Sequence, residues 1–255
     1  MILHHIEVGD GCPLVILHGL LGSSGNWRTI AKKLSDICRV IAIDLPNHGA
    51  SPHMEKADIN VICESVIETM QALDVEKAVL LGHSMGGKIA MQLSSDYPDA
   101  LTALIVADML PKSIPPAHLF ILRACEQLDL ASATHRSELD QALTCSVVQP
   151  EVRAFILKNI KRDVENRFYW QVNLRNIIAN YRIVSDAPEL LRPYTGATLF
   201  IGGENSPYKI ATEENLIHGW FPNAQIAVIK NAGHLVHADQ PEIFSATVRN
   251  FILSL

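Results

Sequence analysis

The sequence of 255 residues predicts an α/β fold in which a mostly parallel sheet is flanked by helices and carries a helical insertion. The main observation is that short apolar runs alternate with helix-like stretches, which is typical of parallel strands joined by crossover helices. A second observation is that this alternation stops after residue 110 and resumes after residue 193. A third is a strand, a Gly-x-Ser-x-Gly turn and a helix over residues 78–97.

Two strands are predicted at the start of the chain, over residues 2–8 and 13–17. The turn signal Gly9-Asp10-Gly11 between them favours an antiparallel hairpin. The elements expected next are a helix over residues 27–34, a strand over 38–45, a helix over 60–73, a strand over 78–81, a helix over 85–97 and a strand over 101–108. The runs at 38–45 and 101–108 are almost wholly apolar, so both faces of these strands are expected to be covered.

The region from Pro111 to Pro193 contains no run typical of a buried strand. Apolar residues at helical spacing predict helices there over residues 119–128, 137–147, 151–161 and 175–184. The alternation then returns with a strand over 197–201, a helix over 213–220, a strand over 225–229 and a helix over 241–253. Residues 1–110 and 194–255 are therefore expected to form the core, and 111–193 a helical cap insertion over the carboxyl ends of the strands, where open sheets bind ligands.

Composition and charge exclude several classes of protein. The net charge is −6 and no long basic run is present, which argues against a nucleic-acid partner. The five scattered cysteines include no Cys-x-x-Cys, so we expect reduced thiols and a cytoplasmic location. The first residues lack a signal-peptide pattern, and no apolar run approaches the ~20 residues of a membrane span.

The turn Gly82-x-Ser84-x-Gly86 is the strongest chemical signal in the chain. A sharp turn between a strand and a helix strains the backbone of its central residue and lifts the hydroxyl above the sheet. Glycines on either side leave room where a β-carbon would strike the neighbouring strand or helix. The helix that follows directs partial positive charge towards an oxyanion beside the serine. Ser84 is therefore predicted to be a nucleophile.

A nucleophilic serine needs a base, an acid that orients the base, and donors for the oxyanion. His234 is the best candidate for the base, because it follows the last predicted strand and comes after the serine in chain order. The glycine-marked loop 18–22 directly follows a strand, so the backbone N–H groups of Leu20 and Met85 are the expected oxyanion donors. His234 and His237 lack a third ligand at matching spacing, so no metal site is predicted.

Four ordered motifs resemble those of the α/β-hydrolase superfamily. They are His18-Gly19-x-x-Gly22, Asp44-x-x-x-x-Gly49-x-Ser51, Gly82-x-Ser84-x-Gly86 and Gly233-His234. Within that superfamily, the stretches 82–88, 205–208 and 233–238 resemble the YbfF family of bacterial esterases. The resemblance covers the whole chain apart from the insertion. It implies hydrolysis of acyl esters or acyl thioesters without a cofactor, and an insertion that forms a helical cap.

The acid of the expected triad has two candidates. Many members of the superfamily carry it in a Gly-x-x-Asp loop after the penultimate strand, but the matching position here is Ser206, which cannot hold a negative charge. Asp108 ends the apolar strand that follows the helix after Ser84, where a buried carboxylate needs a partner. Glu204 lies in the altered loop itself. Asp108 is the favoured acid and Glu204 the alternative.

Three residues are candidates for substrate binding. Asn47 lies in a loop expected at the mouth of the pocket, Trp170 in an aromatic run of the cap, and Tyr208 in a stretch that carries the resemblance. Turn formation or packing is the alternative role for Asn47 and Trp170. The apolar face of the helix predicted over residues 151–161 is interpreted as part of a solvated cap helix, or else as a contact with a membrane surface.

The function predicted from these residues is cleavage of a small-molecule ester or thioester by a cofactor-free serine hydrolase. Ser84 attacks the acyl carbon, His234 moves the proton, and Asp108 holds the imidazolium. Two alternatives stay open. One is a lyase on the same fold, of the type of the menaquinone-pathway synthase. The other is a ligand-binding protein that keeps the hydrolase fold without catalysis.

Overall fold

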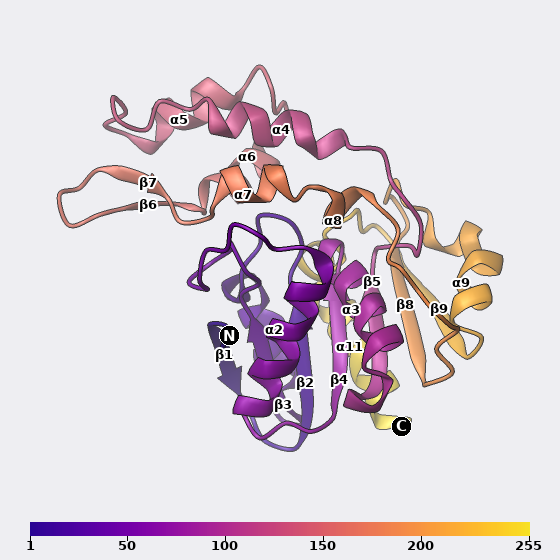
Figure 1. Ribbon diagram of the computed structural model, residues 1–255. Helices are drawn as coiled ribbons and strands as arrows, with labels where there is room; N and C mark the ends of the chain where they lie inside the picture. Colours follow the sequence, from indigo (N-terminus) through magenta and orange to yellow (C-terminus); the bar gives the residue numbers. More distant parts are fainter.

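The computed structural model describes residues 1–255, and a seven-stranded sheet lies at its centre (Figure 1). The strands in chain order are β1 (His5–Val8), β2 (Cys12–Leu17), β3 (Cys38–Ile43), β4 (Ala78–His83), β5 (Leu101–Ala107), β8 (Thr198–Gly203) and β9 (Ala224–Ile229). Their order across the sheet is β1-β3-β2-β4-β5-β8-β9. Only the pair of β1 and β3 is antiparallel. The predicted α/β class with a mostly parallel sheet is confirmed.

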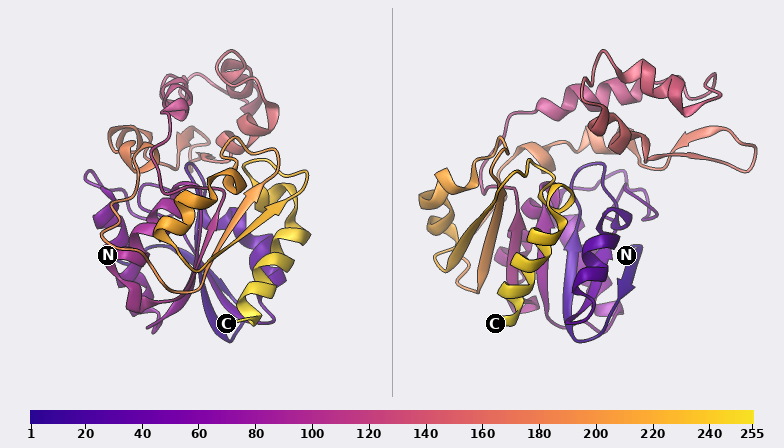
Figure 2. Two further views of the ribbon diagram at one scale, coloured as in Figure 1. Left: turned by 90° about the vertical axis from the view of Figure 1, so that its right-hand side faces the viewer. Right: turned by 180° about the vertical axis from the view of Figure 1, so that it is seen from behind.

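Helices cover both faces of the sheet (Figure 2). One face carries α2 (Ile59–Ala72) and α3 (Met85–Asp96), the other carries α1 (Arg28–Leu34) and α11 (Pro241–Leu253), and α9 (Glu214–Trp220) lies beside β9. Side chains of β2 alternate between the two cores: Val15 and Leu17 face α2 and α3, whereas Leu14 and Ile16 face α1 and α11. Because both faces are covered, the central strands are apolar throughout, and this made them recognisable in the sequence.

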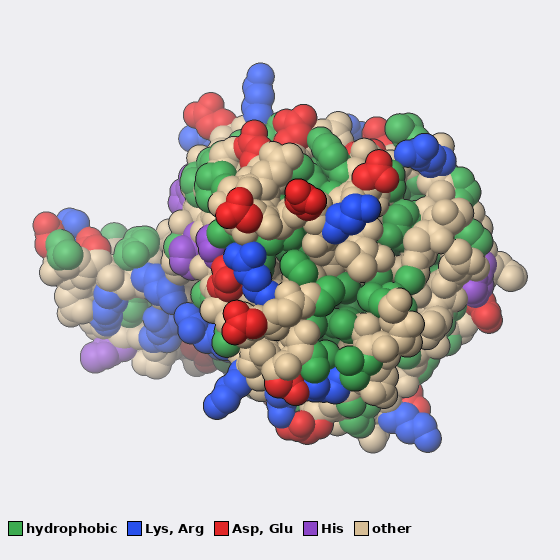
Figure 3. Space-filling model, turned by 90° about the horizontal axis from the view of Figure 1, so that it is seen from below, with side chains coloured by type: hydrophobic (Ala, Val, Ile, Leu, Met, Phe, Trp, Pro, Cys, Tyr) green, Lys and Arg blue, Asp and Glu red, His purple; other side chains and the backbone are tan.

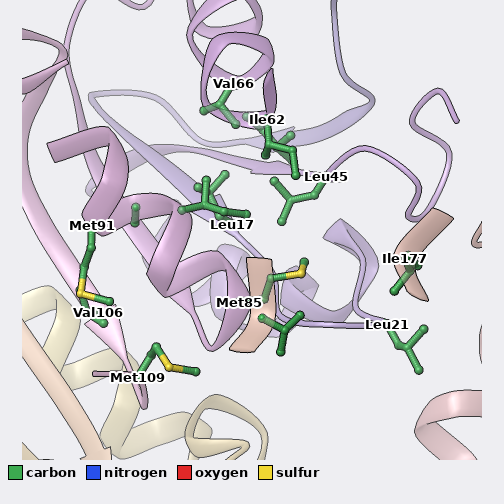
Figure 4. Packing of buried hydrophobic residues seen from close by; sticks show 14 of the residues in the cluster. Leu17, Leu21, Leu45, Ile62, Val66, Met85, Met91, Val106, Met109 and Ile177 are labelled. Carbon is green, nitrogen blue, oxygen red and sulfur yellow. The ribbon is translucent and has the colours of Figure 1, made fainter. Parts of the chain in front are cut away.

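The larger of the two cores reaches from the sheet to the segment above it. Figure 4 shows part of this core, where Leu17 of β2, Ile62 of α2 and Met85 of α3 lie among other apolar side chains. Leu21, in the loop after β2, and Ile177, from the segment between β5 and β8, belong to the same cluster. The two parts of the chain therefore share a continuous apolar interior.

The prediction of an antiparallel hairpin at the start of the chain is wrong. β1 pairs with β3, with His5 opposite Ile43, while β2 lies on the other side of β3 and runs parallel to it. Gly9 and Gly11 have φ angles of +82° and +105° and carry the chain across the end of β3. A β-carbon on Gly9 would lie 2.4 Å from the carbonyl oxygen of Cys38. The turn was recognised correctly, but β2 is the more apolar strand and takes the central position, which leaves the edge to β1.

Between β5 and β8 the chain leaves the sheet and lies above one end of it (Figures 1 and 2). This segment contains α4 (Ala117–Glu126), α5 (Arg136–Leu143), α6 (Pro150–Leu157), β6 (Ile160–Arg162), β7 (Phe168–Trp170), α7 (Leu174–Ala179) and α8 (Arg182–Ser185). The hairpin of β6 and β7 was not expected: the helix predicted to reach residue 161 ends at Leu157, and the hairpin turns at Asn166, where φ is +65°. The helix predicted over 175–184 is instead two short helices.

The end of this segment is fixed to one face of α3. Lys88 donates a hydrogen bond of 2.5 Å to the carbonyl oxygen of Asp186, and Gln92 exchanges two hydrogen bonds with the backbone of Glu189. Ser95 accepts a backbone N–H from the same stretch. The spacing of Lys88, Gln92 and Ser95 places them on one side of the helix. Burial lowers the pKa of Lys88 to about 8.

The surface shows no large area of one charge on the side away from the inserted segment. Figure 3 shows this side, where acidic and basic side chains are interspersed over the rounded body of the molecule. This distribution fits the net charge of −6. None of the helices is long and apolar enough to cross a membrane.

Candidate active site

Ser84 occupies a strained turn between β4 and α3. Its φ of 54° and ψ of −118° lie in a region that side chains other than glycine rarely adopt. A β-carbon on Gly82 would lie 2.1 Å from the carbonyl oxygen of Gly86, and one on Gly86 would lie 2.3 Å from that of Leu17. The two glycines therefore permit the close contacts that hold the turn, as the spacing of the motif predicts.

A continuous chain of hydrogen bonds runs from Ser84 through His234 to Asp108. Nε2 of His234 lies 2.9 Å from Oγ of Ser84, and Nδ1 lies 2.7 Å from Oδ2 of Asp108. Asp108 directly follows β5 and is fully buried, whereas the His234 side chain, in the loop after β9, is 26% exposed. The carboxyl ends of parallel strands meet at one edge of a sheet, which is why residues so far apart in the chain converge here.

The carboxylate of Asp108 accepts hydrogen bonds from three directions. Besides His234, the last N–H of β8 donates to its Oδ1 at 3.1 Å, and the hydroxyl of Ser206 donates to its Oδ2 at 2.5 Å. Ser206, at the position that matches the usual acid, thus contacts an acid supplied by the neighbouring strand. Glu204 is exposed, and its carboxylate accepts the N–H of Asn231 at 3.1 Å. Of the two candidate acids, Asp108 is the one that contacts His234.

His83 supports the loop that carries His234. Its Nε2 lies 2.9 Å from the carbonyl oxygen of His234. A carbonyl oxygen only accepts, so Nε2 of His83 carries the proton and donates. Burial, together with the neighbouring His234 and His237, holds the pKa of His83 well below its ordinary value, so this ring is neutral at pH 7. The side chain of His83, the last residue of β4, thereby fixes the backbone of His234 by a hydrogen bond.

Two backbone N–H groups beside Ser84 have no acceptor within the protein. One belongs to Leu20, in the loop after β2. The other belongs to Met85, in the first turn of α3, where a helix offers no internal partner. His18 shapes the loop, because its Nε2 accepts the N–H of Leu45 at 2.9 Å and its Nδ1 donates to the adjacent carbonyl oxygen. The predicted oxyanion donors are thus both free to bind a ligand.

Ser84 opens into a pocket of about 220 Å³. One wall comes from α4, α6 and α8 and is apolar apart from His118 of α4. Its apolar side chains are Ile121, Leu122, Val152, Phe155, Ile156 and Val184. The opposite wall is formed by residues 18–22 of the loop after β2, together with Asn26, Trp27, His83, Leu235 and His237. The apolar face of α6, interpreted from the sequence as solvated or membrane-facing, therefore faces this pocket.

The three predicted substrate-binding residues lie outside the lining of this pocket. Asn47 is buried with φ of 66°, and its Oδ1 accepts an N–H from the same loop at 2.9 Å. Trp170 lies in the hairpin of β6 and β7. Tyr208 packs against His234 with ring centroids 4.9 Å apart, and burial raises its pKa to about 12. The structure brings Tyr208 to the site as a neighbour of His234, and it leaves Asn47 and Trp170 away from the pocket.

The pocket residues that sequence reasoning missed are those of the apolar wall, together with Asn26 and Trp27 of the opposite wall. Apolar residues at helical spacing do appear in the sequence, at Ile121 and Leu122 of α4 and at Phe155 and Ile156 of α6. This spacing identifies an apolar helix face, but it does not indicate which surface the face covers. Asn26 has no comparable signal, because it lies in the 3₁₀ turn Ser24–Trp27, which was not predicted: the expected helix began at residue 27.

Comparisons with known proteins agree with this geometry. A family model described as the alpha/beta hydrolase fold matches residues 13–124. The chain is 35% identical to sn-1-specific diacylglycerol lipase ABHD11 of Xenopus laevis, over 96% of this chain and 80% of that one. It is 29% identical to esterase YbfF of Escherichia coli, over 95% and 94% of the two chains. A solved structure described as a marine microorganism esterase superimposes with a TM-score of 0.94 at 35% identity, covering 98% of this chain and 99% of that one.

The fold, the strained serine turn and these similarities lead to the same assignment. A relative that is 35% identical over 96% of this chain and 80% of its own length establishes membership of a family. The resemblance found in four short motifs of the sequence is therefore confirmed. The chain belongs to the α/β-hydrolase superfamily.

Proposed function

We propose that the protein is a serine hydrolase that cleaves carboxylic esters or acyl thioesters of small molecules. The observation that carries this proposal is the unbroken chain of hydrogen bonds from Ser84 through His234 to Asp108. A pair of free backbone N–H groups beside the serine supports it, as do relatives named esterase and lipase. Ser84 is the nucleophile, His234 the general base, and Asp108 the acid that orients the base.

Acylation uses each of these groups in turn. Nε2 of His234 takes the proton of Ser84 while Oγ attacks the acyl carbon, and Asp108 stabilises the imidazolium that forms. The N–H groups of Leu20 and Met85 bind the oxyanion of the tetrahedral intermediate. Each such donor lowers the activation free energy by about 2.7–4 kcal/mol. His234 then gives its proton to the leaving oxygen or sulfur, and the bond to the acyl carbon breaks.

Deacylation repeats the same steps with water. His234 takes a proton from the water that attacks the acyl-enzyme, and the proton passes to Ser84 as the carboxylic acid leaves. The apolar wall formed by α4 and α6 is suited to an acyl chain, because it covers the space above Ser84 with aliphatic and aromatic side chains. The inserted segment is therefore assigned to acyl-chain binding.

The proposal includes a cytoplasmic location. All five cysteines carry free thiols, and three of them, Cys38, Cys63 and Cys125, are buried. Reduced, buried thiols are typical of proteins in a reducing compartment. Small-molecule esters or thioesters of that compartment are then the expected substrates.

Turnover of aryl esters and thioesters by the purified protein tests the proposal. Ser84→Ala should lower kcat/KM by about 10³-fold or more, because the attacking oxygen is lost. Ser254→Ala, at the exposed end of α11, is a matched control and should keep the parent rate. Absence of turnover for every ester and thioester, or a Ser84→Ala variant as active as the parent, would contradict the proposal. Lyase activity in place of hydrolysis would favour the alternative on the same fold.

A further inference from the structure

The pocket has a polar wall that the mechanism above leaves unused. We define it by Asn26, Trp27, His83 and His237, all of which line the pocket. The ring of His237 stacks on Trp27, with centroids 4.2 Å apart and planes 10° apart. The ring of His83 has its centroid 4.8 Å from that of His237 and 4.8 Å from that of His234. The polar wall thus begins next to His234 and leads away from it.

The position of His234 decides which half of an ester meets this wall. The leaving oxygen must receive its proton from Nε2 of His234, so the leaving group lies beside that ring during acylation. The acyl chain extends on the other side of the reacting carbon. The wall of α4 and α6 is apolar and suits the acyl chain, whereas the polar wall adjoins His234. The alcohol half of the substrate is therefore the half that faces the polar wall.

The pocket contains no formal charge that could bind an ionic group. None of its lining residues is Lys, Arg, Asp or Glu. Burial lowers the pKa of His18, His83, His118 and His237, and for His237 the value is about 3. These rings are neutral at pH 7. A phosphate, carboxylate or ammonium in this part of the pocket would lose water without gaining a partner, which is unfavourable.

Two polar groups of this wall have no partner within the protein. His237 is only 8% exposed, neither ring nitrogen makes a hydrogen bond, and Nδ1 is buried. Oδ1 of Asn26 accepts the N–H of Ser23 at 2.8 Å, which orients the amide so that Nδ2 is left free. An unpaired buried nitrogen destabilises a fold, and a phenylalanine ring would stack on Trp27 without this penalty. The unpaired nitrogens point to a hydrogen-bonding ligand.

We propose that the polar wall binds the alcohol half of the ester, and that this alcohol is an uncharged polyol whose hydroxyls bond to Asn26 and His237. This inference rests on the proposed function, because it assigns the leaving group of the same reaction. One hydroxyl accepts from Nδ2 of Asn26 and another bonds to Nε2 of His237, the ring nitrogen that is not buried. On acylation the ester oxygen of the polyol takes the proton from Nε2 of His234, its bond to the acyl carbon breaks, and the free polyol leaves.

Two esters with the same acyl chain test this inference. One is the glycerol monoester and the other the propyl ester, which has the same number of leaving-group carbons but no free hydroxyl. The parent should show a higher kcat/KM for the glycerol ester. His237→Phe and Asn26→Ala should each reduce that preference by about three- to tenfold, the effect of losing one hydrogen bond. His135→Phe and Asn60→Ala, at exposed positions on other elements, are the matched controls and should keep the parent preference.

The deacylation rate is the readout that separates binding of the alcohol from general damage. Both esters form the same acyl-enzyme. Loss of a contact with the alcohol therefore lowers the acylation rate constant and leaves the deacylation rate constant unchanged. Equal kcat/KM for the two esters in the parent would overturn the inference. So would variants that slow both esters equally, or a preference of the parent for choline or phosphate-bearing esters. Turnover of thioesters but of neither ester would also overturn the inference, whereas turnover of no ester and no thioester would refute the proposed function. Asn26→Ala keeps the test decisive if His237→Phe does not fold.

Discussion

Asp108→Asn keeps the size of the side chain but cannot satisfy the groups around it. Oδ1 faces the N–H of Gly203, and Oδ2 accepts from both His234 and Ser206. If the amide NH₂ replaces Oδ2, it donates to Nδ1 of His234. The neutral imidazole then carries its proton on Nε2, facing Ser84, and cannot accept the proton of the nucleophile. If the amide is reversed, its NH₂ meets the N–H of Gly203, and two donors face each other in a fully buried site.

The expected loss in kcat is about 10⁴-fold, the effect of the same substitution in a serine protease triad. That factor corresponds to about 5.4 kcal/mol of transition-state stabilisation. Either orientation also leaves a buried polar group unpaired, so stability should fall by about 1–3 kcal/mol. The assay is kcat for an aryl ester, with a circular dichroism spectrum and a melting temperature on the same preparation. A folded variant with a low kcat then separates chemistry from unfolding.

Glu204→Gln is the matched control for this substitution. Glu204 is exposed and bonds to the backbone of Asn231, so its replacement should change kcat by less than roughly tenfold. A nearly fully active Asp108→Asn together with an inactive Glu204→Gln would refute the reasoning. That result would assign the acid to the loop after β8.

Two further predictions concern the apolar wall of the pocket and two buried histidine rings. Phe155→Ala should shift the ratio of kcat/KM between long and short acyl chains by about tenfold or less, because it enlarges the space along the apolar wall. Trp170→Ala, outside the pocket, should leave this ratio unchanged. An unchanged ratio in Phe155→Ala would contradict the assignment of this wall to the acyl chain. His48 and His237 are buried with a pKa of about 3, below the unfolded value near 6.5, so the unfolded chain binds more protons between these limits. Stability should be full above about pH 6.5 and decrease towards pH 3, by up to about 1.4 kcal/mol per pH unit for each ring. His237→Phe should reduce that slope in urea unfolding, and an unchanged slope would contradict the prediction.

The serine turn was predictable from the sequence because its requirements are local. Gly82, Ser84 and Gly86 lie within five residues, and the strand and helix on either side have distinct apolar patterns. The acid was only partly predictable. Asp108 and Ser206 are 98 positions apart, and their hydrogen bond depends on the pairing of β5 with β8, which no local pattern encodes.

The first strand and the pocket walls show the same limit. A glycine-marked turn between two strands is compatible with a hairpin and equally with a crossing over a third strand, and only the burial of β2 between β3 and β4 decides between them. The apolar face of α6 was interpreted as part of a solvated helix or as a membrane contact, because the surface it covers depends on where the inserted segment lies over the sheet. Local residue patterns therefore predicted helices, strands and turns, whereas long-range packing determined which strands pair and which surface a helix covers.

The central claim is that the acyl group passes through Ser84. The most direct measurement is mass spectrometry of the protein after reaction with a fluorophosphonate and after rapid acid quench of a turning-over ester. One adduct per chain is expected in both samples, on the peptide that contains Ser84, and none in Ser84→Ala. Ester turnover with an adduct on another residue, or with Ser84 unmodified in both samples, would contradict it.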